Sequence, residues 1–287
     1  MTPENTINYN SASCLRAFLE REGLGMRKKF GQNFLINPSI RQALVDALDA
    51  REGDEVWEVG PGLGAMTSLL LEKGFSVKAF EIDPGFIGVL KKLFCGEKRF
   101  TLIEGDVMKT WSTQEPSPFF LGNLPYNVAA ALLADLIEKG RLFTRMVVTV
   151  QKETALRMAA AAGTGDYSSF SVLCQSVYKV KPLMLIRPSS FYPQPNVDSM
   201  GVLLESLPPL SYPAVFYPLV RSLFSSRRKT IKNNLTNFLS SRFAKSSPAQ
   251  ICASVLAENS LSGNERAEKL NCGEFLSLAK SIENVRL

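Results

Sequence analysis

Four consecutive residues, Asn123, Leu124, Pro125 and Tyr126, carry the groups needed to hold a planar heterocyclic amine. The Asn123 side chain has an amide oxygen that accepts hydrogen bonds and an NH2 group that donates them. Pro125 disfavours helical backbone at the preceding residue, so the Leu124 carbonyl can point into a pocket. Tyr126 adds an aromatic ring on which a heterocycle can stack. The pattern is typical of a site for an exocyclic amine, although a plain proline turn after a strand would also contain these residues.

An apolar run precedes the four residues and predicts the strand that positions them. Phe119, Phe120 and Leu121 are followed by Gly122. A short continuous apolar run that ends at a glycine is typical of a buried strand. We therefore expect residues 123–126 to form a short polar loop at the edge of a sheet.

A glycine-rich segment further upstream predicts a nucleotide-binding turn. Gly60, Gly62 and Gly64 alternate with other residues after the strand-like Val56-Trp57 pair and before the helix-forming segment 65–73. A strand, a glycine turn and a helix together allow the backbone to approach a ligand closely. The dinucleotide fingerprint has a third glycine where this chain has Thr67.

Acidic residues end the next two predicted strands. Glu81 lies near the end of the segment 77–82, seventeen positions after Gly64, and the segment 101–104 leads into Gly105-Asp106. Because ligands bind outside the carboxyl ends of the strands in open α/β sheets, these residues are expected beside the glycine turn and Asn123. A carboxylate at Glu81 suits a ribose diol, either of NAD or of S-adenosylmethionine. One at Asp106 suits an adenine amino group.

The distribution of elements predicts two domains. Asn37-Pro38 opens a helix with proline at its first position, and alternating strand and helix patterns then continue to about Leu204. Four prolines between residues 208 and 218 interrupt this pattern. Beyond them we expect helices at 219–224, 230–238, 249–256 and 274–281, the last opened by a capping box of Asn271 and Glu274.

The composition excludes several classes of protein. The chain has 287 residues, a net charge of +6 and no histidine, so a histidine-based triad or histidine-ligated metal is excluded. Its five cysteines are far apart and form no Cys-x-x-Cys pair, which argues against a zinc site. No apolar run is long enough to span a membrane, and the first 26 residues resemble neither a signal nor a transit peptide. We expect a cytoplasmic protein.

The ordered motifs resemble those of the small-subunit ribosomal RNA adenine dimethyltransferases. This family dimethylates two adjacent adenosines near the 3′ end of 16S rRNA. The resemblance runs from about Arg27 to the C-terminus. It rests on the motifs Lys29–Leu35, Gly60–Gly64, Glu81-Ile82-Asp83, Gly105-Asp106, Gly122–Asn127, Val150–Glu153, Phe191–Ser199 and Phe224–Thr230.

The resemblance implies a fold, a cofactor and a set of site residues. The fold is α/β, a doubly wound, Rossmann-like class I methyltransferase sheet at residues 27–207, with a small all-helical RNA-binding domain at 208–287 after an N-terminal extension, 1–26. The cofactor is S-adenosylmethionine, with no metal. The implied cofactor-binding residues are Asn33, Leu35, Gly60, Gly62, Glu81, Asp106 and Asn123, and the implied catalytic residues are Asn123, Leu124, Pro125, Tyr126 and Phe191.

Two clusters of basic residues predict contacts with RNA phosphates. No acidic residue lies between Arg221 and Lys232, which is unusual for a solvated helix face. Beside an RNA-modifying domain, phosphate binding is the better interpretation. The expected RNA-binding residues are Arg27, Lys28, Lys29, Arg221, Arg227, Arg228, Lys229 and Lys232. The expected partner is 16S rRNA within the small ribosomal subunit or its precursor, bound by a monomer.

Some residues leave the interpretation open. Phe191 could stack on an extruded base, but a core aromatic before a proline turn would also explain it, and Tyr192 is the weaker candidate. Asp198 and Ser199 match the family, but no role follows for them. Residues 1–26 have no family counterpart that we can assign, and Ser168-Ser169 replace a common Gly-Arg pair.

Other functions explain parts of the same pattern. The methyltransferases that confer macrolide resistance on 23S rRNA share much of the pattern, but they usually have isoleucine at the position of Leu124. A non-catalytic ribosome-assembly relative could keep the fold and still bind RNA. A dehydrogenase is disfavoured by the missing third glycine, and a DNA adenine methyltransferase by the arginine-rich segment 224–230.

Overall fold

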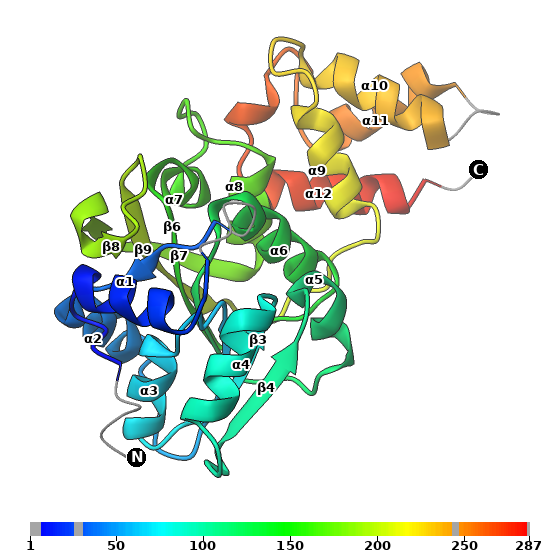
Figure 1. The fold of residues 1–287 in the computed structure, drawn as a ribbon. Helices are drawn as coiled ribbons and strands as arrows, with labels where there is room; N and C mark the ends of the chain where they lie inside the picture. Colours follow the sequence, from blue (N-terminus) through cyan, green and yellow to red (C-terminus); the bar gives the residue numbers. More distant parts are fainter. Residues whose placement is uncertain (1–6, 26–30, 243–246, 286–287) are drawn as a thin grey trace. The chain divides into compact units, whose positions relative to one another are not determined.

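The computed structural model describes residues 7–25, 31–242 and 247–285 (Figure 1). The chain divides into two compact units. The first unit comprises the chain up to Ala155 together with Val180–Ser206, and the second comprises Leu156–Lys179 and Leu207–Leu287.

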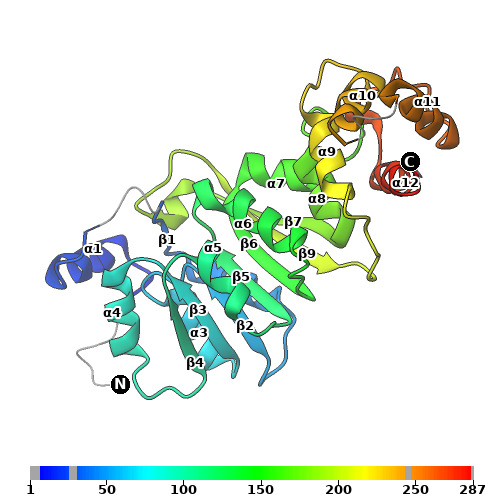
Figure 2. The same cartoon turned by 90° about the vertical axis from the view of Figure 1, so that its right-hand side faces the viewer.

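A mixed sheet forms the centre of the first unit. Its strands lie in the order β4-β3-β2-β5-β6-β9-β7 (Figure 2). Neighbours from β4 to β6 pair in parallel, and β9 pairs antiparallel with β6. The strand bounds are β2 Glu55–Val59, β3 Ser76–Glu81, β4 Phe100–Glu104, β5 Phe119–Asn123, β6 Arg145–Gln151, β7 Tyr178–Ile186 and β9 Ser199–Ser206. Strands β2, β3 and β4 follow one another toward one edge of the sheet, and the chain then returns to β5 on the other side of β2. Open α/β sheets bind their ligands at such a point, which lies here between β2 and β5.

Short helices and a two-stranded ribbon surround this sheet. Their bounds are α1 Ala12–Arg21, β1 Phe34–Leu35, α2 Pro38–Asp46, α3 Ala65–Glu72, α4 Pro84–Leu93, α5 Val107–Thr110, α6 Tyr126–Glu138 and β8 Phe191–Tyr192, with 3-10 turns at Trp111–Thr113 and Pro188–Ser190. The predicted start of α2 is confirmed, because the Asn37 side chain accepts a hydrogen bond from the Ile40 amide and Pro38 is the first helical residue.

The core of the first unit lies on both faces of the sheet. Because successive side chains of a strand point to opposite faces, Val56 and Trp57 belong to different apolar layers. Val56 joins a cluster that contains Leu44 and Leu70 from the helices α2 and α3. Trp57 contacts the rings of Phe80 and Phe143, at centroid distances of 4.9 and 5.4 Å. The near-continuous apolar strands are those expected of a sheet covered on both sides.

The second unit is helical and has its own apolar core. Its elements are α8 Ser169–Val177, α9 Phe216–Phe224, α10 Ile231–Arg242, α11 Pro248–Glu258, the 3-10 turn Ala267–Lys269 and α12 Cys272–Glu283; α7 Lys152–Ala159 begins in the first unit and ends in the second. Phe216, Leu235 and Phe275 are fully buried in this core. The expected capping box is confirmed: the Glu274 amide donates to Asn271, and the Asn271 amide donates to the Glu274 carboxylate.

The division of the chain differs from the expected domains in one segment. Residues 156–179 belong to the helical unit, although the sequence placed them with the sheet. The reason is packing, since Tyr167 and Val172 are buried in the same cluster as Phe216 and Phe275. The described part of the N-terminal extension, 7–25, belongs to the first unit.

Candidate active site

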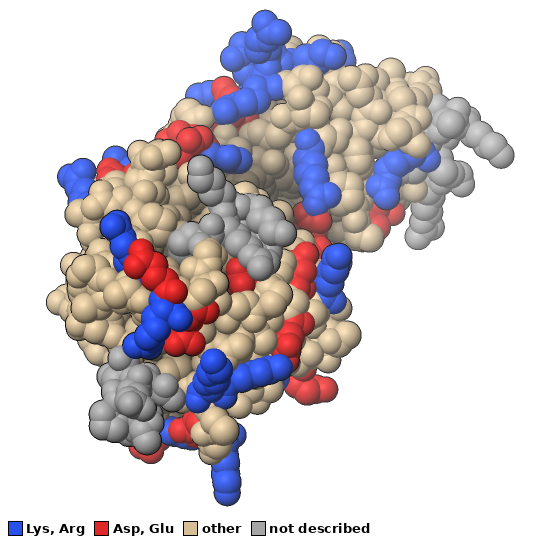
Figure 3. All heavy atoms as spheres, in the orientation of Figure 1, with Lys and Arg blue, Asp and Glu red and all other residues tan. Residues whose placement is uncertain are grey.

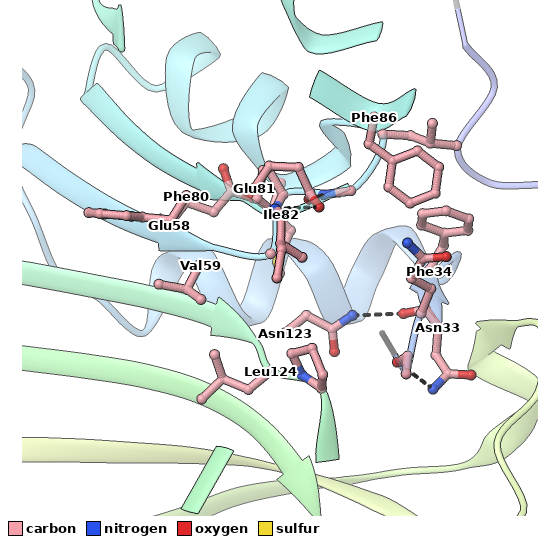
Figure 4. Close-up of a pocket in the computed structure, with 18 of the residues that line it drawn as sticks. Asn33, Phe34, Glu58, Val59, Phe80, Glu81, Ile82, Phe86, Asn123 and Leu124 are labelled. Atoms are coloured by element: carbon pink, nitrogen blue, oxygen red, sulfur yellow. Dashed lines mark hydrogen bonds between the residues drawn. The ribbon is translucent and has the colours of Figure 1, made fainter. Parts of the chain in front are cut away.

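A pocket lies at the carboxyl ends of β2, β3 and β5 in the first unit (Figure 4). Its walls come from the glycine turn, from the ends of these strands, and from the segment that precedes α2. All seven residues expected to bind the cofactor line this pocket: Asn33, Leu35, Gly60, Gly62, Glu81, Asp106 and Asn123. The structure therefore brings together residues that are as much as 90 positions apart in the sequence.

The glycine turn needs glycine at Gly62 for two reasons. Its φ of +57° is in the left-handed region, which side chains other than glycine rarely adopt. A Cβ at this position would also lie 2.9 Å from Cε1 of the Phe34 ring. Because Gly62 has no side chain, its backbone itself lines the pocket.

Glu81 fastens the glycine turn to the end of β3. Its carboxylate accepts hydrogen bonds from the amides of Gly62, Ile82 and Asp83 at 3.0, 3.0 and 2.8 Å. The side chain is only 5% exposed, and burial raises its pKa to about 7. When ionised, these carboxylate oxygens can also accept from the two hydroxyls of a ribose.

A second buried carboxylate, Glu58, lies beside the pocket and was not assigned a role from the sequence. It is 1% exposed, its carboxylate accepts a 2.6 Å hydrogen bond from the Thr67 hydroxyl, and burial raises its pKa to about 7. Thr67 stands where the dinucleotide fingerprint has its third glycine, and its hydroxyl supplies the hydrogen bond that the buried Glu58 carboxylate accepts. The signal in the sequence was an acidic residue within the apolar run Val56–Val59.

Asp106 and Ile82 form the part of the pocket that suits a purine. One carboxylate oxygen of Asp106 caps α5 by accepting from the Met108 amide at 3.0 Å. A carboxylate has two oxygens, so the other can accept from an adenine amino group. Ile82 lines the pocket and is 41% exposed, which is unusual for a large apolar side chain beside a core.

The Asn123 amide is oriented by a contact with the opposite wall. Its Nδ2 donates a 2.8 Å hydrogen bond to the Asn33 carbonyl, as the dashed line in Figure 4 shows. This bond uses the donor end of the amide and leaves Oδ1 as the acceptor toward a substrate amine. The next residue is held by its own backbone, because the Leu124 amide donates to the Thr149 carbonyl and its side chain is buried.

Pro125 and Tyr126 form the start of α6 rather than an open loop. Pro125 is the N-cap and Tyr126 the first helical residue. The Tyr126 hydroxyl lies 2.5 Å from that of Ser199, which is fully buried at the start of β9. Pro125 lines the pocket, and Tyr126 is not among its lining residues.

The structure corrects the expectation for Phe191. Its side chain is 1% exposed and belongs to the core cluster that contains Leu35, its partner in the antiparallel β1–β8 ribbon. In this arrangement the ring cannot stack on a substrate base. Phe191 is the core aromatic residue that the sequence also allowed. Tyr192 points the other way, as alternation along a strand requires, and its hydroxyl accepts a 3.3 Å hydrogen bond from Arg16.

The expected RNA-binding residues are only partly described. Arg27, Lys28 and Lys29 lie outside the described residues. Arg221, Arg227, Arg228, Lys229 and Lys232 are exposed in the second unit, where Figure 3 shows basic side chains gathered at the upper end. Arg227 donates to the carbonyls of Gly165 and Tyr167 and pairs with Glu268.

The described part of the chain contains neither a candidate metal centre nor a membrane-spanning helix. Within residues 7–25, 31–242 and 247–285, no group of three or more histidine, cysteine or acidic residues could hold a metal ion. None of the helices in the described part of the chain is long and apolar enough to cross a membrane.

Solved structures support the fold. A dimethyladenosine transferase from Plasmodium falciparum superposes with a TM-score of 0.75 and 27% identity, covering 86% of this chain and 96% of that one. The 23S rRNA methyltransferase ErmE superposes with a TM-score of 0.63 at 21% identity, covering 87% and 99% of the two chains. The expected class I methyltransferase fold is confirmed.

Related sequences identify the family. The Ribosomal RNA small subunit methyltransferase A of Treponema denticola is 47% identical over 285 residues, covering 96% of each chain. The protein of the same name from Borreliella burgdorferi is 38% identical over 280 residues, covering 96% of this chain and 95% of that one. The model of the family described as ribosomal RNA adenine dimethylase matches residues 23–283. This chain therefore belongs to the ribosomal RNA adenine dimethylase family.

Proposed function

We propose that this protein converts two adjacent adenosines in the 3′-terminal hairpin loop of 16S rRNA to N6,N6-dimethyladenosine, during assembly of the small ribosomal subunit. The relatives from Treponema and Borreliella are named as small-subunit methyltransferases. The observation that carries the proposal is the orientation of the Asn123 amide at the edge of the pocket, where its Nδ2 donates to the Asn33 carbonyl.

S-adenosylmethionine is the cofactor of this family, and the pocket residues fit it. Glu81 suits the ribose hydroxyls, Asp106 suits the adenine amino group, and Ile82 offers an apolar surface to the purine. Because Gly60 and Gly62 have no side chains, the cofactor can approach the backbone of the turn closely. When bound, the cofactor supplies an electrophilic methyl group.

The last residue of β5, Asn123, and the residue after it, Leu124, then act on the adenine amine. The lone pair of this amine is delocalised into the ring and must be turned toward the methyl group. Hydrogen bonds from the amine to Asn123 Oδ1 and to the Leu124 carbonyl favour that orientation, so the main contribution is alignment. The proton lost from the nitrogen can pass to water, which explains why a chain without histidine can perform this reaction.

RNA binding is assigned to the basic side chains of the second unit. Arg221, Arg228, Lys229 and Lys232 are exposed there and suit phosphate contacts. Extrusion of the target base costs a few kcal/mol of stacking, which such contacts offset. We place the activity in the cytoplasm, as a monomer on the subunit or its precursor.

The test is methyl transfer from labelled S-adenosylmethionine to small subunits that lack the modification, followed by mass spectrometry of the nucleosides. Large-subunit RNA and duplex DNA serve as controls. We expect dimethyladenosine only in the 3′ region of 16S rRNA. Label on large-subunit RNA would replace the proposed substrate, and tight subunit binding without transfer would make the protein an assembly factor.

A further inference from the structure

An N-terminal segment that precedes the residues matched by the family model reaches the cofactor pocket. We call residues 7–22 the N-terminal strap; they comprise a short non-helical segment, 7–11, and the whole of α1. The family model begins only at residue 23. The match to the Treponema denticola relative covers 96% of this chain. The uncovered 4% amounts to fewer residues than the 26 that precede Arg27, so this match includes part of the N-terminal region. Two strap residues, Tyr9 and Leu15, line the pocket.

The strap is bonded directly to the glycine turn. The Tyr9 hydroxyl donates a 2.9 Å hydrogen bond to the carbonyl of Leu63, which lies between Gly62 and Gly64. A tyrosine phenol is protonated at neutral pH and can donate, and burial raises the pKa of Tyr9 further, to about 12. This bond joins residues 54 positions apart in the sequence.

Arg41 of α2 also holds the strap, at Tyr9 and Asn10. Its guanidinium donates to the carbonyls of Leu35 at 2.6 Å and Tyr9 at 3.4 Å, and to the side chain of Asn10. The side chain is 7% exposed and also lines the pocket. One buried cation thus ties the strap to the Asn33–Leu35 wall of the cofactor site.

An apolar contact completes the attachment. Ile7, Leu15 and Leu19 of the strap pack against Leu63 of the glycine turn and against Phe86 and Val89 of α4. All six side chains are buried. Leu63 is therefore held from two sides, by a hydrogen bond to its carbonyl and by apolar side chains around its own side chain. Phe86 appears in Figure 4 on the same wall as Phe34.

We propose that the N-terminal strap is a part of the S-adenosylmethionine site that clamps the glycine turn in its binding conformation. The turn has positive φ at Gly60, Gly62 and Gly64, so it loses much conformational freedom when it is ordered. A turn that is already ordered by the strap binds the cofactor without that loss. The inference deepens the proposed function and rests on its cofactor.

The test is the dissociation constant of S-adenosylhomocysteine, measured by titration calorimetry on the full chain and on variants. Deletion of residues 1–22 is expected to raise the Kd about tenfold or more, and Tyr9→Phe about threefold. Glu20→Gln, on the exposed side of the same helix, is the matched control and is expected to leave the Kd unchanged. Amide hydrogen exchange of the peptide that spans residues 57–66, without ligand, should be faster in the deletion and in Tyr9→Phe.

The outcomes distinguish a role of the strap in cofactor binding from a purely structural role. A lower melting temperature with an unchanged Kd, measured well below that temperature, would overturn the proposal. If the deletion does not fold, Tyr9→Phe and Leu15→Ala decide the question by the same two measurements. If the full chain binds S-adenosylhomocysteine in a strap-dependent way but transfers no methyl group to 16S rRNA, the strap stands and the proposed reaction falls.

Discussion

The hydroxyl of Tyr126 lies 2.5 Å from the hydroxyl of Ser199, and this contact joins the start of α6 to the start of β9. Ser199 is fully buried, so its hydroxyl has a fixed position. Burial also raises the pKa of Tyr126, which keeps its phenol protonated and able to take part in the hydrogen bond. The tyrosine ring is thus anchored at its far end, directly after the Asn123 loop. Ser199 had no role assigned from its sequence context, and we expect it to position Tyr126.

Removing either hydroxyl should slow methyl transfer without affecting cofactor binding. We expect Ser199→Ala and Tyr126→Phe each to lower kcat about tenfold, with the Kd of S-adenosylhomocysteine changed less than about twofold. Because both variants break the same bond, the double variant should be little worse than either single one. Independent losses that multiply in the double variant would contradict the positioning role.

Asn123 should be needed for transfer far more than for cofactor binding. Its Oδ1 is the proposed acceptor for the adenine amine, while its Nδ2 contacts Asn33 in the pocket wall. We expect Asn123→Ala to lower kcat about a hundredfold or more, and to weaken S-adenosylhomocysteine binding only a few-fold. Single-turnover transfer and calorimetry measure the two effects. Equal losses in both would assign Asn123 to cofactor binding alone.

Glu58 should make the cofactor-free protein less stable at alkaline pH. The pKa of this buried group is raised from 4.5 to about 7, so its contribution to folding is fully present below about pH 4.5 and is lost as the pH rises through 7. The loss is at most about 3 kcal/mol in the free energy of unfolding. Glu58→Gln cannot ionise and should melt higher than the parent at pH 8 but alike at pH 5. A lower melting temperature at both pH values would show that the carboxylate is needed for packing.

Alanine at Gly62 should weaken cofactor binding because its Cβ would collide with the Phe34 ring, and a control variant can isolate this steric effect. Both Gly62 and Gly96 have positive φ, so alanine strains the backbone by about 1 kcal/mol at either position. Only at Gly62 does a Cβ meet another group, the Phe34 ring at 2.9 Å, whereas nothing lies within 4 Å at Gly96. Gly62→Ala should weaken S-adenosylhomocysteine binding about tenfold more than Gly96→Ala does. Equal affinities would show that Phe34 moves aside without cost.

Local patterns were enough to predict many of the elements, but not α1, β7 or the β1–β8 ribbon, and to predict the edge of the sheet on which the pocket lies. The capping residues Asn37 and Asn271 and the apolar strand at Phe119 all work through neighbours a few positions away. That Gly60, Glu81, Asp106 and Asn123 meet in one pocket was also predictable, because the carboxyl ends of parallel strands meet at one edge. Asn33 and Leu35 came from the family resemblance alone, and cofactor binding by all of these residues stays a prediction.

Contacts between distant segments could not be predicted from such patterns. The Tyr9–Leu63 and Tyr126–Ser199 bonds span 54 and 73 positions, and no periodicity indicates them. Phe191 was misplaced for a related reason: an aromatic residue before a proline looks the same in a core and at a binding surface. Only its pairing with Leu35 in the ribbon decides that it is buried.

Arg227 should behave differently from its basic neighbours in the second unit. Its guanidinium donates to the Gly165 and Tyr167 carbonyls and pairs with Glu268, so Arg227→Ala should lower the free energy of unfolding by about 1–2 kcal/mol. Arg228→Ala is the matched control, because Arg228 is exposed, and it should leave the melting temperature unchanged. Arg228→Ala should instead reduce the slope of log K against log salt for 16S rRNA binding by about one phosphate contact. A reduced salt slope in Arg227→Ala with an unchanged melting temperature would return Arg227 to the set of phosphate-binding residues.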